Sequence, residues 1–289
     1  MRILITGAAG MLGSAVVPHL QECGHDVFPT DITELDVRDR ADVASGLNAI
    51  RPEIVLHLAA ETSLEVCEEE PDHAWLTNAI GTKNVALECR RRAIPMAYIS
   101  SAGIFDGENP GPLGYTEFDT PSPINVYGAS KLQGEHYVRQ YVPESWILRA
   151  GWMMGGGPHK DHKFIHHIVD QIDAGVTDIV AVVDKVGSPT YSKDFAAIIE
   201  RLITSDDYGT YHCVSGGQCT RFDVAQAIIE ILGRDDITLK PASSGFFATT
   251  FHAPRPASEA MRNYCLDLIS ANGMRPWREA LADYLKEWQ

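Results

Sequence analysis

The chain has 289 residues, enough for about two ordinary domains or one large α/β unit. Its 39 acidic residues against 24 basic ones give a formal charge of −15, which argues against nucleic acid or an anionic membrane surface as a partner. No apolar stretch approaches the ~18 residues of a membrane span, and the first residues lead straight into a strand rather than a cleavable leader, so we expect a soluble, cytoplasmic protein.

Short apolar runs alternate with amphipathic stretches through the first half of the chain. Continuous apolar runs predict buried strands, and apolar residues spaced three and four apart predict helices. We expect strands at residues 2–6, 26–30, 54–59, 96–100 and 146–149, and helices at 13–23, 39–50, 72–92 and 125–141. This alternation predicts an α/β fold with a Rossmann-type, doubly wound parallel sheet that helices cover on both faces.

The pattern changes after residue 150. A turn-rich break of three glycines and a proline at 155–158 is followed by predicted helices at 163–174, 192–204 and 221–232 and a strand at 179–183. We interpret residues 151–289 as a smaller lobe that leans on residues 1–150, with the chain crossing between the two. Because ligands of parallel sheets bind beyond the carboxyl ends of the strands, the loops after residues 6, 30, 59, 100 and 149 should line one crevice.

Three glycines, Gly7, Gly10 and Gly13, lie between the first strand and the first helix. Glycine lets such a turn close and lets the backbone approach a pyrophosphate, whose charge is favoured by the helix N-terminus. Together with Met11 and Leu12, these residues predict a dinucleotide site rather than a plain tight turn. Residues 1–150 are therefore predicted to be a dinucleotide-binding domain.

Asp31 ends the second predicted strand, where a carboxylate can accept both hydroxyls of an adenosine ribose. The plainer alternative is a turn or helix-capping aspartate. No arginine follows Asp31 directly to neutralise a 2′-phosphate, which favours NAD over NADP. Asp36 and Val37 come next, in a loop that either lies against the adenine or is ordinary surface, and His57 is interpreted as a core histidine bonded to backbone.

Tyr127 and Lys131 are four residues apart, which puts both side chains on one face of the helix predicted at 125–141. A nearby cation stabilises a phenolate and lowers the pKa of the phenol, which makes it a usable acid or base. An exposed helical pair is the alternative. The pair follows a glycine-rich turn and lies about thirty residues beyond Ser100 and Ser101, and this combination favours catalysis.

These motifs resemble those of the extended short-chain dehydrogenases/reductases, and within that group those of the dTDP-4-dehydrorhamnose reductase family. The resemblance runs nearly end to end. Beyond the glycine-rich turn it rests on Arg51-Pro52, residues 57–60, Glu68, Asn78, Phe105-Asp106-Gly107, Tyr127 to Lys131 with Gly134-Glu135, and Leu148-Arg149 with Trp152. In the second half, residues 187–191 with Asp194, and Arg255-Pro256 with Ser258, make the match specific to this branch.

The resemblance implies a sugar-nucleotide reductase, in which a reduced nicotinamide transfers hydride to a 4-keto hexose on a nucleoside diphosphate. Asp31 favours NADH over NADPH in this role. The resemblance also implies that Tyr127 is the acid, that Lys131 positions the cofactor and tunes Tyr127, and that Ser101 bonds the reacting oxygen. Residues 151–289 are then expected to form the substrate-binding lobe. A homodimer is the oligomeric state that we consider for the protein. Further cofactor contacts are expected from Leu58, Ala59, Ala60, Asn78 and Ser100, and substrate contacts from Ser101, Ala102, Trp152, Phe164 and Arg255.

The chain departs from this family beside Ser101. The family continues with Asp and Tyr, where this chain has Ala102 and Gly103, and Glu61 replaces a frequent aromatic residue. Loss of these groups predicts weak or no reduction of dTDP-4-keto-6-deoxymannose and better turnover of a sugar that is bulkier or differently substituted at that point. The alternative is that Glu61 or the second lobe fills the gap.

Two other functions stay open. The residues after Ser100 resemble those of sugar-nucleotide epimerases, which oxidise their substrate transiently with tightly held NAD. A regulatory cofactor-binding subunit, like the relatives that accompany methionine adenosyltransferase, fits the altered pocket but not the intact Ser101, Tyr127 and Lys131. A dehydratase is disfavoured because no carboxylic acid follows Ser101.

Six cysteines are spread through the chain without a Cys-x-x-Cys pair, so we expect buried, reduced thiols rather than disulfides or a zinc site. The histidines at 159, 162, 166 and 167, with Asp161 and Asp170, raise the question of a metal. They follow a Gly-Pro break on a predicted exposed helix start, so we interpret them as solvated side chains and predict no metal site.

Overall fold

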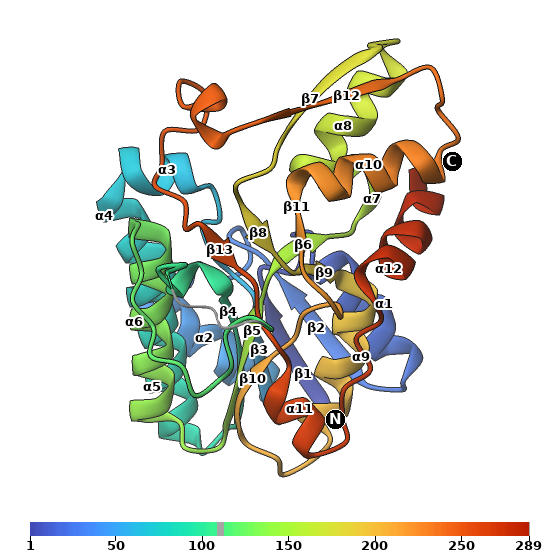
Figure 1. Cartoon of the computed structure of the whole chain (residues 1–289). Coiled ribbons are helices and arrows are strands. Elements are labelled where there is room, and N and C mark those ends of the chain that lie inside the picture. The colour runs from blue at the N-terminus through green and yellow to red at the C-terminus, as the bar shows by residue number, and fades with distance from the viewer. Residues whose placement is uncertain (109–112, 289) are drawn as a thin grey trace.

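The computed structural model describes residues 1–108 and 113–288, and its centre is a six-stranded parallel sheet (Figure 1). The strand order is β10-β5-β4-β3-β1-β2. These strands are β1 (Arg2–Thr6), β2 (Asp26–Thr30), β3 (Ile54–His57), β4 (Met96–Ser101), β5 (Ser145–Ala150) and β10 (Gly209–His212). The winding direction reverses between β1 and β3, which places a crevice at the carboxyl ends of those two strands. The predicted fold class is confirmed.

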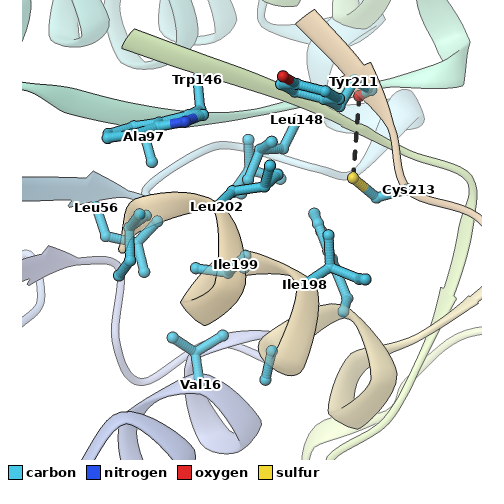
Figure 2. Close-up of a cluster of buried hydrophobic side chains, with 14 of the residues drawn as sticks. Val16, Leu56, Ala97, Trp146, Leu148, Ile198, Ile199, Leu202, Tyr211 and Cys213 are labelled. Atoms are coloured by element: carbon cyan, nitrogen blue, oxygen red, sulfur yellow. Dashed lines mark hydrogen bonds between the residues drawn. The ribbon is translucent and has the colours of Figure 1, made fainter. Parts of the chain in front are cut away.

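Helices cover both faces of this sheet, as predicted. On one face lie α1 (Gly13–Glu22) and α9 (Ser192–Ile203), and on the other α2 (Arg40–Ile50), α5 (Thr82–Arg92) and α6 (Val126–Tyr141). Alternate strand residues serve opposite faces: Ile3 and Ile5 pack toward α1, and Leu4 packs toward α2. Figure 2 shows the first face, where Ile198, Ile199 and Leu202 of α9 meet side chains of the sheet.

Part of the chain after residue 150 belongs to this central layer. Strand β10 pairs with β5 at the edge of the sheet, and α9 packs against α1. The chain therefore crosses between the two parts, and the division at residue 150 stays a prediction.

The second lobe has its own apolar core, built from Ile165, Ile168 and Ile172 of one helix and Val224 and Ile228 of another. Its helices are α7 (Gly157–Lys160), α8 (Phe164–Asp173), α10 (Arg221–Ile231) and α12 (Trp277–Tyr284), while α11 (Tyr264–Leu268) packs near β10. Its strands are β6 (Trp152–Met154), β7 (Asp178–Val182), β8 (Val186–Gly187), β9 (Pro189–Tyr191), β11 (Cys219–Thr220), β12 (Thr238–Ala242) and β13 (Ser258–Glu259).

Two predicted elements differ from the observed ones by more than a residue at an end. The strand predicted at 54–59 ends at His57, so residues 58–60 are free to form the loop above it. The single helix predicted at 72–92 is divided: α4 (Pro71–Ala74) leads into the π-helical turn η1 (Trp75–Gly81), and α5 follows. The short helix α3 (Leu64–Glu69) and the 3₁₀ turns η2 (Ala102–Ile104), η3 (Ser244–Phe247) and η4 (Leu285–Trp288) complete the described elements.

Within residues 1–108 and 113–288, none of the helices has both the length and the apolar character needed to cross a membrane.

Candidate active site

A cavity of about 1640 Å³ lies over the carboxyl ends of the parallel strands, where the sheet faces the second lobe. Residues following β1, β2, β3, β4 and β5 line it, which confirms that these five loops share one crevice. Residues of β7, α8 and α10 line the opposite wall.

Most of the predicted site residues line this cavity. They are Gly7, Gly10, Met11, Leu12, Gly13, Asp31, Asp36, Val37, Leu58, Ala59, Ala60, Ser100, Ser101, Tyr127, Lys131, Trp152, Phe164 and Arg255. Asn78 and Ala102 do not. The Asn78 amide is buried and bonds the backbone of Glu61 and the hydroxyl of Ser130, so it braces the loop after β3. Ala102 is buried in a small apolar cluster with Phe105.

The glycine-rich turn packs too closely for larger residues. A Cβ on Gly7, whose φ is +67°, would lie 2.6 Å from the Ala59 backbone, and a Cβ on Gly13 would lie 2.1 Å from the Ala8 carbonyl oxygen. The absence of a side chain at Gly7 lets the turn pack against the loop after β3, and its absence at Gly13 lets α1 begin directly beside the turn. The helix start therefore faces the cavity.

The start of α1 has backbone N–H groups that make no hydrogen bond within the protein. Its N-cap residue, Leu12, provides no side-chain cap, and its first turn carries no acidic residue. Within the described chain, the N–H groups of Met11 and Leu12 have no acceptor. Exposed N–H groups at a helix N-terminus suit a phosphate. The turn therefore fits the pyrophosphate of a dinucleotide.

Asp31 is tied to the turn. Its Oδ2 accepts a hydrogen bond of 3.0 Å from the N–H of Ala9, and its Oδ1 accepts one from Ile32. Arg38 also lines the cavity, and its guanidinium donates to both carboxylate oxygens of Asp36 at 2.7 to 3.1 Å. Arg38, one candidate cation for a 2′-phosphate, is thus already paired with a carboxylate.

Tyr127 and Lys131 share the first turns of α6, and a second close approach positions them. A Cβ on Gly128 would lie 2.0 Å from the carbonyl oxygen of Gly103, so glycine lets α6 start directly against the residues that follow Ser101. Asn125 caps this helix by accepting from the N–H of Gly128 at 2.7 Å. The Lys131 Nζ lies 4.2 Å from the ring centre of Tyr98.

Burial controls the proton affinities of this pair. It raises the pKa of Tyr127 to about 12, and a hydrogen bond with the Ser101 side chain acts in the opposite direction. It lowers the pKa of Lys131 to about 7, which the Glu135 carboxylate offsets only in part. Burial is the largest cause of both shifts, and the lowering of the Tyr127 pKa by Lys131 stays a prediction. The phenol stays protonated at neutral pH, the form in which an acid donates.

A buried ion pair supports α6 behind Lys131. Glu135 accepts two hydrogen bonds of 2.9 Å from the Arg149 guanidinium, and both side chains are almost fully buried. Burial alone would raise the pKa of Glu135, but the hydrogen bonds and charge of Arg149 hold it below its usual range. The pair links α6 to β5.

Glu61 lines the cavity with both carboxylate oxygens in use. One accepts from the N–H of Ser63 at 2.8 Å, and the other lies 3.4 Å from the Nε2 of His73. These contacts weaken the alternative that Glu61 replaces the groups lost at positions 102 and 103. A Cβ on Gly103 would lie 3.4 Å from the Tyr127 ring, so the altered position is directly beside the phenol.

The second-lobe wall carries Trp152, Phe164 and Arg255, and their contacts with substrate stay a prediction. The Trp152 indole donates to Glu259 at 2.7 Å. Arg255 donates to both Glu65 oxygens at 2.8 and 3.1 Å, so its charge is balanced within the protein.

Sequence reasoning missed four cations on this wall, Lys160, Lys163, Lys185 and Arg221. Lys160 and Lys185 donate to the backbone carbonyls of Ala9 and Arg255. The capping box of Thr220 and Asp223 could have shown where α10 begins, but no local pattern indicates that its first residue faces a cavity.

His57 is a core residue, as predicted, but its partners are hydroxyls rather than backbone. Its ring nitrogens lie 2.6 Å from the Thr6 Oγ1 and 3.0 Å from the Thr82 Oγ1. Burial lowers its pKa to about 3, so it is neutral at physiological pH.

The six cysteines are free thiols, and four of them, Cys67, Cys89, Cys213 and Cys219, are buried. In the histidine-rich segment, His166 pairs with Asp170 at 2.9 Å, and its ring packs edge-on against that of His162. Among the residues that the structure describes, no three His, Cys, Asp or Glu side chains are grouped to hold a metal ion.

Comparison with known proteins places both lobes in one family. The whole chain, residues 1–289, matches the family model described as RmlD substrate binding domain. The spore coat polysaccharide biosynthesis protein SpsK of Bacillus subtilis is 33% identical over 288 residues, covering 99% of this chain and 97% of that protein.

Two solved structures are similar throughout. A dTDP-4-dehydrorhamnose reductase from Clostridium acetobutylicum has a TM-score of 0.92 and 34% identity, with 99% of each chain covered. The dTDP-4-dehydrorhamnose reductase from Bacillus anthracis in complex with NADP has a TM-score of 0.92 and 33% identity, with 100% of this chain and 99% of that chain covered.

Proposed function

The chain belongs to the RmlD substrate binding domain family, and from this premise we propose that it is an NAD(P)-dependent oxidoreductase that reduces a nucleotide-linked 4-keto sugar. The observation that carries the proposal is that one cavity joins a glycine-rich turn with free N–H donors to the group of Ser101, Tyr127 and Lys131. Two proteins that resemble the chain over their full lengths are named dTDP-4-dehydrorhamnose reductases, which supports this substrate class.

In this proposal Tyr127 donates the proton to the sugar oxygen that was the ketone. Its raised pKa keeps the phenol protonated until the developing alkoxide, a stronger base, takes the proton. Ser101 donates a second hydrogen bond to the same oxygen. Lys131 positions the cofactor ribose, and the Glu135–Arg149 pair holds its helix in place.

The chain's own residues would hold the cofactor along the floor of the cavity. The glycine-rich turn and the N–H groups of Met11 and Leu12 would take the pyrophosphate, and residues 58–60 would line the path toward Ser101. The reduced nicotinamide, when bound, supplies the hydride.

We predict that the enzyme binds NADH more tightly than NADPH. A 2′-phosphate would lie near the Asp31 carboxylate, and like charges at such range near a surface cost on the order of 1–4 kcal/mol, about tenfold or more in affinity. Arg38 offers little relief because Asp36 already binds it. Titration of wild-type protein with each cofactor measures the difference. Asp31→Ala should narrow it, and equal or tighter binding of NADPH to wild type contradicts the preference.

A sugar-nucleotide epimerase that retains NAD is the second candidate, favoured by Gly103 beside Tyr127. The nicotinamide content of the protein as purified separates the two. A reductase releases its cofactor and consumes reduced nicotinamide in step with product. Near-stoichiometric NAD that survives purification, with no net consumption of reduced nicotinamide, would instead establish the epimerase.

We also propose a homodimer in the cytoplasm. Trp75, Leu76 and Ile80 of η1 each expose more than a third of their surface and form an apolar area that a second copy could cover.

A further inference from the structure

The glycine-rich break near the start of the second lobe lies beside the first turn of α1. Gly155, Gly156 and Gly157 all have positive φ and lead into α7. A Cβ on Gly156, whose φ is +78°, would lie 3.2 Å from the Oγ of Ser14. The Ser14 hydroxyl in turn donates to the carbonyl of Met11 at 2.7 Å. Glycine therefore lets this second-lobe segment pack against the start of α1.

Lys160, the last residue of α7, reaches from the second lobe to the glycine-rich turn. Its ammonium donates to the carbonyl of Ala9, within that turn, at 2.8 Å. The side chain lines the cavity, and across residues 1–108 and 113–288 it makes no ion pair, whereas Arg38 on the same cavity is bound to Asp36. An ammonium has three N–H groups and Ala9 takes one of them, so two donors and the positive charge remain for a ligand at the turn.

Helix α7 is anchored on the side of the second lobe. The carboxylate of Asp161, the residue after Lys160, is buried and accepts from the Tyr284 hydroxyl at 2.9 Å and from the Lys163 N–H at 2.7 Å. These bonds direct the carboxylate into the second lobe, so it does not pair with Lys160. The helix also packs against η4. Lys160 is thus held at the turn by residues of the other lobe.

We propose that Lys160 is a cofactor-binding residue of the second lobe, which contacts the pyrophosphate at the glycine-rich turn so that the cofactor is held from both lobes. This inference rests on the proposed function. The N–H groups of Met11 and Leu12 supply hydrogen bonds but no net charge, and the Asp31 carboxylate, bonded to the same turn, is negative. The ammonium of Lys160 supplies the positive charge that a dianionic pyrophosphate needs there. Because Lys160 and the turn belong to different lobes, the bound cofactor strengthens the contact between them.

The test is the Kd of NADH and that of NADPH for the full-length protein, titrated at low and at high NaCl. Lys160→Gln keeps an N–H donor but removes the charge, and it should raise both Kd values by about tenfold, the typical size for a hydrogen bond to a charged group. Lys160→Arg restores the charge and should recover most of the loss. The Kd of wild type should rise with NaCl more steeply than that of Lys160→Gln, because salt screens the attraction that the variant lacks.

Lys185→Gln is the matched control, since Lys185 also lines the cavity and donates to a backbone carbonyl, that of Arg255, at 2.7 Å. It should leave both Kd values within about twofold of wild type. The proposal is overturned if Lys160→Gln binds NADH like wild type, or if Lys160→Arg binds it as weakly as Lys160→Gln, which would make the role one of packing.

The comparison of the two cofactors locates the contact. Loss of NADPH affinity alone in Lys160→Gln also overturns the proposal, because Lys160 would then contact the 2′-phosphate and not the pyrophosphate. These titrations need no turnover, so a failure of the proposed reaction is seen separately. Wild-type protein that binds neither cofactor would contradict the proposed function itself, and this inference with it.

Discussion

Tyr127→Phe should lower kcat on an authentic keto-sugar substrate by about 10²-fold or more. The variant keeps the ring and removes only the hydroxyl, so the proton that the phenol delivers must come from water. The Kd of the reduced cofactor should stay near that of wild type, because Lys131 and the glycine-rich turn are intact. Loss of reduced-nicotinamide absorbance measures kcat, and equilibrium titration with the reduced cofactor measures its Kd.

Tyr137→Phe is the control for this experiment. Tyr137 lies on the same helix and stacks on Tyr141, away from the cavity-lining residues. It should retain wild-type turnover. If Tyr127→Phe also turns over at the wild-type rate, Tyr127 is not the acid.

The largest loss of stability is expected at the Glu135–Arg149 pair. Glu135→Leu leaves the buried guanidinium of Arg149 without its counter-charge, and removal of one partner of such a pair costs about 3–5 kcal/mol in the free energy of unfolding. Urea denaturation at neutral pH measures it. The double variant Glu135→Leu/Arg149→Met should recover most of that free energy, because it removes both charges. A loss below about 1 kcal/mol in the single variant would mean that the pair behaves like a surface ion pair.

Local sequence patterns predicted the central layer well. The first strand and its glycine-rich turn, the Asp31 strand end and the Tyr127 helix all lie where the periodicity put them, since each is built from neighbouring residues with strong preferences. Strand β10 was missed because its four residues become a strand only by pairing with β5, about sixty residues earlier in the chain. The π turn at Trp75–Gly81 likewise follows no local signal.

The site residues likewise divide into those that local sequence predicts and those that depend on distant contacts. Gly7, Ser101, Tyr127 and Lys131 could be found because their spacing along the chain reflects their chemistry. Arg221 could not, since its contact with Trp152 depends on how β6 and the start of α10, far apart in the sequence, come together within the second lobe. The lowered pKa of Lys131 could not be predicted either. Spacing along the chain indicates which groups are near one another, but it does not indicate how far each group is removed from water.

The central claim is tested most directly by kcat/KM for a panel of nucleoside-diphosphate 4-keto sugars with NADH, measured by loss of reduced-nicotinamide absorbance. Reduction of at least one 4-keto sugar is expected, and a sugar bulkier or differently substituted opposite Gly103 should be preferred to dTDP-4-keto-6-deoxymannose. An efficiency above ~10⁴ M⁻¹s⁻¹ on that last sugar would contradict the predicted preference. Consumption of no reduced nicotinamide with any 4-keto sugar, by protein that binds NADH, would contradict the reductase itself.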